Sequence, residues 1–149
     1  MEQRISLVTL AVADPDRAAA FYAALGWTLQ DGPPGIRVFD LLGQSLALYS
    51  RADLARDMGL TEAELGTGGL TLAYNTRSKE EVAQVLARAA AAGARILRDA
   101  HDVFWGGHIG YFADPDGHIW EVAFNPFSPL SEAGAFRWAG YGAGAEQSG

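Results

Sequence analysis

The 149-residue sequence has no cysteine, no long apolar run and no cluster of basic residues. The absence of cysteine excludes disulfide bonds, thiolate metal ligands and cysteine nucleophiles. No stretch approaches the ~18 consecutive apolar residues that a membrane-spanning helix needs, so no membrane partner is expected. The formal net charge is -7, from 11 Lys and Arg against 18 Asp and Glu. Without clustered positive charge, nucleic-acid binding is not expected either.

A length of 149 residues predicts one domain, or two small halves that share one core. Apolar residues make up 49% of the chain and are spread along its length, which excludes a disordered chain. The N-terminal residues 1–17 lack an apolar segment followed by a small-residue cleavage site, so no secretory signal is expected. A cytoplasmic location is then the default expectation. Low-complexity sequence is confined to residues 140–149, which we expect to form a tail.

The chain shows two halves with the same order of elements: strand, helix, strand, strand, strand. In the first half, Asp14-Pro15 is typical of a helix start and Gly26 of a helix end. In the second half, Ser78 and Glu81 predict a capping box. We expect strands at 5–12, 27–30, 36–41 and 45–50 with a helix at 16–25, a partly helical connector at 51–66, and strands at 69–75, 94–97, 107–113 and 118–124 with a helix at 80–92.

Two short sequence repeats support a duplication. Thr9-Leu10-Ala11 recurs as Thr71-Leu72-Ala73, and Asp40-x-x-Gly43 recurs as Asp114-x-x-Gly117 just before the last strand of its half. Three-letter matches also arise by chance. Their agreement in order with the predicted elements favours a repeated unit.

Alternation along the first and last strand of each half predicts one bulky face and one face of small residues. The second face would carry Leu7, Thr9, Ala11, Ser45, Ala47, Tyr49, Gly69, Thr71, Ala73, Ile119, Glu121 and Ala123. Only Glu121 among them is charged. A face exposed to solvent would carry more charge, so a concave surface around a ligand cavity is favoured over it.

The runs LVTLAVADPDRAAAFYAALGW (7–27) and GGHIGYFADPDGHIWEVAFNP (106–126) resemble the vicinal oxygen chelate superfamily. This group includes glyoxalase I, extradiol dioxygenases, fosfomycin-resistance enzymes and bleomycin-resistance proteins. The resemblance covers residues 4–126 and implies an α+β fold. Two βαβββ modules would form an incomplete barrel around a cleft, often completed by homodimerisation. The modules would span 4–50 and 68–126, joined by a connector at 51–67 and followed by a tail at 127–149.

The metal enzymes of this superfamily place ligands on the first and last strand of each module. In this sequence those positions fall on Leu7, Ala47, Gly69 and Glu121. Three of them have no side-chain donor, whereas a divalent first-row metal needs about three protein ligands. We therefore expect no metal and no cofactor. The favoured function is metal-independent binding of a small organic molecule, and the alternative is a metal-dependent lyase, transferase or dioxygenase of the superfamily.

The carboxylate of Glu121 on an apolar inner face needs water, a partner or a ligand. The register of the two Asp-x-x-Gly repeats makes Arg37 equivalent to Tyr111 and predicts that both face inward. We expect Glu121, Arg37, Tyr49 and Tyr111 to orient a small ligand, with Trp105 as an aromatic at the rim. Simple pairing of Glu121 with Arg37 and catalysis by Glu121 as a general base remain open, so whether the protein is an enzyme is left undecided.

The three histidines do not form an obvious site. His101 is expected in a solvated polar loop, and His118 has strand parity opposite to that of Glu121. His101, His108 and Glu121 have suitable metal-binding chemistry, but they are not expected to share a face.

Overall fold

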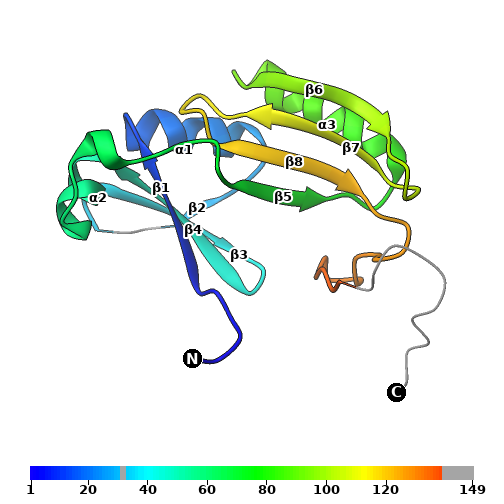
Figure 1. Cartoon of the computed structure of the whole chain (residues 1–149), viewed down its shortest axis with the longest axis horizontal. Helices are drawn as coiled ribbons and strands as arrows, with labels where there is room; N and C mark the ends of the chain where they lie inside the picture. The colour runs from blue at the N-terminus through cyan, green and yellow to red at the C-terminus, as the bar shows by residue number, and fades with distance from the viewer. Residues whose placement is uncertain (31–32, 139–149) are drawn as a thin grey trace. The chain divides into compact units, whose positions relative to one another are not determined.

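The computed structural model describes residues 1–30 and 33–138 (Figure 1). Contacts divide the chain into two compact units. Unit 1 contains Met1–Leu70 and Asp114–His118, and unit 2 contains Thr71–Ala113 and Ile119–Gly149. Each unit holds one four-stranded sheet, and the described residues form no closed barrel. The predicted α+β class and the two βαβββ modules are confirmed.

Unit 1 contains the first module and the connector. Its elements are β1 (Leu7–Val12), α1 (Pro15–Ala24), β2 (Leu29–Gln30), β3 (Ile36–Leu41), β4 (Gln44–Ser50), α2 (Arg51–Met58) and the 3-10 helix η1 (Glu62–Glu64). The strand order is β1–β4–β3–β2, with β1 parallel to β4 and the other neighbours antiparallel. As predicted, the Asp14 side chain caps α1, accepting hydrogen bonds from the backbone N–H groups of Asp16 and Arg17.

Helix α1 packs on β3 and β4 through an aromatic cluster. The Phe39 ring of β3 lies 5.9 Å from the Tyr22 ring of α1 and 5.8 Å from the ring of Trp27. Tyr22 and Phe39 are almost completely buried. Because Leu46 pairs with Phe39 across β3 and β4, it belongs to the same face. The predicted bulky face is therefore the face covered by the helix.

The turn Asp114–His118 joins two strands of unit 2 yet belongs to unit 1. Its buried Asp114 carboxylate accepts a 2.6 Å hydrogen bond from the hydroxyl of Tyr22. The other oxygen of Asp114 accepts from the backbone N–H groups of Asp116 and His118, both at 2.9 Å. One carboxylate thus closes the turn and attaches it to α1.

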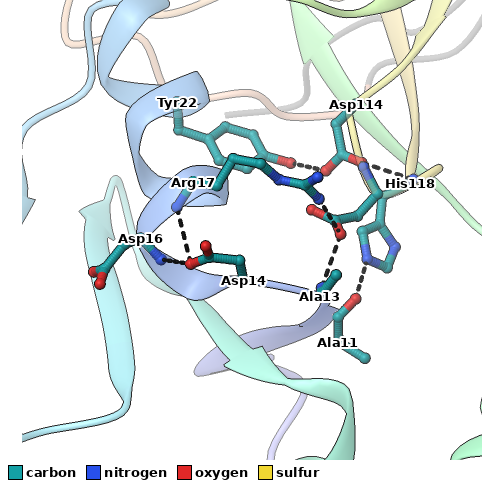
Figure 2. Close-up of polar contacts among 9 residues, drawn as sticks. Ala11, Ala13, Asp14, Asp16, Arg17, Tyr22, Asp114 and His118 are labelled. Atoms are coloured by element: carbon teal, nitrogen blue, oxygen red, sulfur yellow. Dashed lines mark hydrogen bonds and ion pairs between the residues drawn. The ribbon is translucent and has the colours of Figure 1, made fainter.

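Two more side chains of this turn bind unit 1. Asp116 accepts hydrogen bonds from the backbone N–H of Ala13 and from the guanidinium of Arg17, each at 2.9 Å. His118 Nε2 lies 2.7 Å from the carbonyl oxygen of Ala11. Since a carbonyl only accepts, Nε2 carries the proton and donates it. Figure 2 shows His118 pointing toward β1 at this contact.

Unit 2 contains the second module. Its elements are β5 (Thr71–Asn75), α3 (Lys79–Ala91), β6 (Arg95–Asp102), β7 (His108–Ala113) and β8 (Ile119–Phe124). The strand order is β5–β8–β7–β6, with β5 parallel to β8 and the other neighbours antiparallel. Figure 1 shows α3 lying along one face of this sheet, where it contacts β6, β7 and β8.

Helix α3 approaches the sheet closely at a glycine. A Cβ atom on Gly110 of β7 would lie 2.5 Å from Cδ1 of Leu86 and 3.1 Å from the carbonyl oxygen of Arg98. The neighbouring residue on the same face, Phe112, stacks on Trp120 with the ring planes 9° apart. Gly110 and Phe112 therefore mark the face of the sheet that α3 covers.

The sequence placed most elements within two residues of their observed bounds, but two details were wrong. Strand β6 was expected to end at Leu97, whereas it continues to Asp102 through two register shifts. The capping box of α3 is incomplete, since the side chain of Ser78 makes no capping hydrogen bond. Glu81 instead accepts from the backbone N–H of Arg77 at 2.9 Å. Among the described residues, none of the helices has the length and apolarity needed to span a bilayer.

Replacing Tyr22 by Phe removes the hydroxyl that donates to buried Asp114. We expect Y22F to lower the free energy of unfolding by about 1–3 kcal/mol, because a buried carboxylate loses one of its donors. Chemical denaturation measures this loss. Y74F is the matched control, since Tyr74 is exposed, and it should change stability by less than about 0.5 kcal/mol. Equal stability of Y22F and Y74F would contradict this account.

Replacing Gly110 by Ala introduces a methyl group where α3 meets the sheet. The buried Leu86 and the backbone of β6 must both shift, so we expect G110A to destabilise the protein by about 1–3 kcal/mol. The control is G66A, because a Cβ on Gly66 would meet no atom within 4 Å. Thermal unfolding of the two variants measures the difference in their stability. A G110A protein as stable as G66A would show that the packing is looser than described.

Candidate functional site

The centre of the candidate site is a hydrogen bond between two side chains that the sequence analysis had selected. Tyr111 of β7 and Glu121 of β8 are direct cross-strand partners. The Tyr111 hydroxyl donates to Oε2 of Glu121 at 2.6 Å, and both residues are half-buried. This hydrogen bond, together with desolvation and the negative charge of Glu121, raises the pKa of Tyr111 to about 12. The phenol therefore remains a donor above pH 10, where an ordinary tyrosine loses its proton.

These two side chains lie on the face of the sheet opposite α3, hereafter the Tyr111 face. Gly110 and Phe112 flank Tyr111 and belong to the face that α3 covers, and side chains alternate along a strand. Cross-strand pairing gives a continuous row of four residues on the Tyr111 face. In the order β5, β8, β7, β6 these are Ala73, Glu121, Tyr111 and Arg98.

Arg98 is the member of this row that the sequence analysis missed. It pairs with Tyr111 across β6 and β7, between two register shifts of β6. Its positive charge acts on the Tyr111 phenol, partly offsetting the rise of the Tyr111 pKa. The missed signal was the length of β6. If the strand ended at Leu97, Arg98 would lie in a loop and could not be assigned to either face of the sheet. The β-bulges around it also break the regular alternation of side chains from which a face is predicted.

Arg37 was predicted to face inward like Tyr111, and that prediction is wrong. Arg37 pairs with Leu48, just as Phe112 pairs with Trp120. Arg37 therefore occupies the position equivalent to Phe112, on the face covered by α1. Its Nε donates to Oδ1 of Asp16 at 2.7 Å. The guanidinium is thus engaged by α1, and Glu121 is paired with Tyr111 instead.

The two remaining predicted site residues lie in different surroundings. Tyr49 of β4 belongs to unit 1, where desolvation and the nearby carboxylate of Asp57 raise its pKa. Trp105 lies half-buried in the loop between β6 and β7. Its indole covers Gly107 so closely that a Cβ there would lie 2.0 Å from the ring. Within unit 2, the structure pairs Tyr111 directly with Glu121.

The histidines are placed by strand register. His101 was expected in a solvated loop, but it lies in β6 and pairs with Ile109. Ile109 is two residues from Tyr111 along β7, so His101 belongs to the Tyr111 face. Its Nδ1 donates to the carbonyl oxygen of Asp99 at 2.8 Å, while its buried Nε2 has no hydrogen-bond partner among the described residues. His108 belongs to the α3 side, where its Nδ1 lies 2.8 Å from Asp102.

The sequence over residues 4–122 matches the family Glyoxalase, described as the Glyoxalase/Bleomycin resistance protein/Dioxygenase superfamily. The match spans both modules. The chain belongs to this superfamily. The resemblance seen in the two runs of sequence is therefore confirmed, and the mixed sheets agree with the fold of its solved members.

Several solved structures of the superfamily are similar to this chain. A glyoxalase-related enzyme from Fulvimarina pelagi is 37% identical, with a TM-score of 0.86 over 93% of this chain and 99% of that one. A glyoxalase/bleomycin resistance protein/dioxygenase from Nocardioides is 26% identical, with a TM-score of 0.67 over 83% and 84% of the two chains. A lactoylglutathione lyase from Agrobacterium tumefaciens, 24% identical with a TM-score of 0.65 over 83% and 95%, shares the fold. No curated protein matches the sequence significantly.

The metal-ligand positions that the superfamily resemblance implies do not fit a metal here. Leu7, Ala47 and Gly69 offer no donor atom, and Glu121 is hydrogen-bonded to Tyr111. Across residues 1–30 and 33–138, no group of three His, Asp or Glu side chains is arranged to hold a metal ion. A divalent first-row ion requires about three such ligands. We therefore derive no chemical step through a metal at these positions.

The Tyr111–Glu121 hydrogen bond predicts an unusual alkaline titration. Phenolate absorbance of Tyr111, taken as the difference between wild type and Y111F, should rise near pH 12 rather than near pH 10. The raised pKa means that the stabilisation by this bond is complete below pH 10 and is lost as the pH rises toward 12. E121Q should move the titration of Tyr111 back toward its ordinary value. A Tyr111 that titrates near pH 10 in the wild type would contradict the hydrogen bond.

Proposed function

We propose that this superfamily member binds a small organic molecule on the Tyr111 face of unit 2, without a metal ion. The observation that carries the proposal is the half-buried Tyr111–Glu121 pair. A carboxylate within a sheet face loses solvation and needs compensating hydrogen bonds. Tyr111 supplies one donor, to Oε2, and no described residue forms an ion pair with Glu121. The carboxylate can therefore still accept a hydrogen bond from a ligand.

The surroundings of Glu121 favour binding over a purely structural role. Its cross-strand neighbour on β5 is Ala73, and its neighbour two residues along β8 is Ala123. These two alanines leave the carboxylate unobstructed on the side toward β5 and toward the end of β8, whereas Tyr111 and Ile119 lie on its other sides. A few convergent polar groups among small apolar residues are typical of ligand sites.

The test is a screen of small organic fragments by ligand-observed NMR in the presence of EDTA. We expect bound fragments whose affinity falls about tenfold or more in E121Q, since a hydrogen bond to a charged acceptor contributes about 1.5–3 kcal/mol. Gln can still accept from Tyr111, so E121Q should retain the fold. E132Q, which removes an exposed carboxylate of the same unit, is the matched control and should bind as the wild type does.

Two results would overturn the proposal. One is that fragments bind with the same affinity to wild type, E121Q and E132Q, which would place their site elsewhere. The other is that binding disappears with EDTA and returns with a divalent ion, which would favour the metal-dependent alternative despite the donor set.

A further inference from the structure

The row of residues on the Tyr111 face carries opposite charges at its two ends. Arg98 lies on β6, Tyr111 on β7 and Glu121 on β8, each directly opposite the next. The Cα atoms of Arg98 and Glu121 are thus two strand spacings apart, about 9.5 Å. Tyr111 lies on the strand between them and donates to Glu121.

Arg98 has no partner within the part of the chain that the structure describes. It is exposed, and it forms neither a hydrogen bond nor an ion pair with residues 1–30 or 33–138. The other arginine in the strands of unit 2 is Arg95, which pairs with Ala113. Ala113 is two residues from Tyr111 along β7, so Arg95 lies on the same face as Tyr111. Both cations of β6 therefore belong to the Tyr111 face.

The local geometry of β6 directs Arg98 to this face. Register shifts lie on both sides of Arg98, between Ile96 and Arg98 and between Arg98 and His101. A β-bulge adds a residue to one strand and changes the direction of its side chains. Regular pairing onward from Ile96, which pairs with Phe112 of the α3 side, would place Leu97 opposite Tyr111. The bulge places Arg98 there instead.

We infer that the ligand is a small carboxylic acid that also carries a hydroxyl or N–H donor, and this inference rests on the proposed function. The planar guanidinium of Arg98 binds a carboxylate with two parallel hydrogen bonds. The donor at the other end of the molecule binds the carboxylate of Glu121. With a net charge of -7 on the chain, a singly charged acid is favoured over a doubly charged phosphate.

The experiment compares matched acids and amides for binding to the full chain by ligand-observed NMR. The probes are a fragment set in which every carboxylic acid has its primary amide, including 4-hydroxyphenylacetate, 4-hydroxyphenylacetamide and, without the hydroxyl, phenylacetate. We expect acids to bind about tenfold more tightly than their amides, and 4-hydroxyphenylacetate more tightly than phenylacetate. R98Q should abolish the preference for acids. R88Q, which removes an exposed arginine of α3, should keep it.

The outcomes separate this inference from the proposed function. If amides bind as tightly as acids and their binding depends on Glu121, the face binds a neutral ligand and the inference is wrong while the proposed function stands. If acids are preferred equally in R98Q and wild type, the anion lies elsewhere and the inference is also wrong. If no acid or amide of the set binds while other fragments of the first screen bind through Glu121, the inference is wrong and the proposed function stands.

Discussion

The buried carboxylate of Asp114 is the constraint on which the rest of the second module depends. It accepts two backbone N–H groups of its own turn and the hydroxyl of Tyr22. This fixes the turn at five residues, Asp114–His118, between the end of β7 and the start of β8. The length of the turn sets the register in which Ala113 pairs with Ile119. The same register places Tyr111 opposite Glu121, so the candidate site follows from the turn.

The first module shows what a different turn does. There β3 and β4 are joined by only two residues, Leu42 and Gly43. The two Asp-x-x-Gly repeats look alike, yet Asp40 lies inside its strand and pairs with Ser45, whereas Asp114 follows its strand. Counting back from the aspartate of each repeat therefore leads to positions that differ by one residue in strand register, so Arg37 lies on the face opposite to the one that Tyr111 occupies in its sheet. Arg37 consequently pairs with Asp16 of α1, and the arginine beside Tyr111 is Arg98.

The features that the sequence predicted correctly depend on local chemistry or on simple alternation. The Asp14 cap, the helix-covered face with Phe39 and Leu46, and the placement of Tyr111 with Glu121 are of this kind. The missed features are non-local. The face of Arg37 depends on the length of a turn, and the position of Arg98 depends on bulges in an edge strand. Neither the turn length nor the bulges produce a regular pattern of apolar and polar residues, so alternation alone cannot predict the faces of Arg37 and Arg98.

The row of polar side chains on the Tyr111 face is the proposed binding surface for a small molecule. The most direct test is to map chemical-shift changes on ¹⁵N-labelled protein while adding the tightest-binding fragment in the presence of EDTA. We expect changes centred on β6, β7 and β8, at Arg98, Tyr111 and Glu121, which shrink in E121Q. Changes confined to α3 or to unit 1, or an identical map in E121Q, would contradict it.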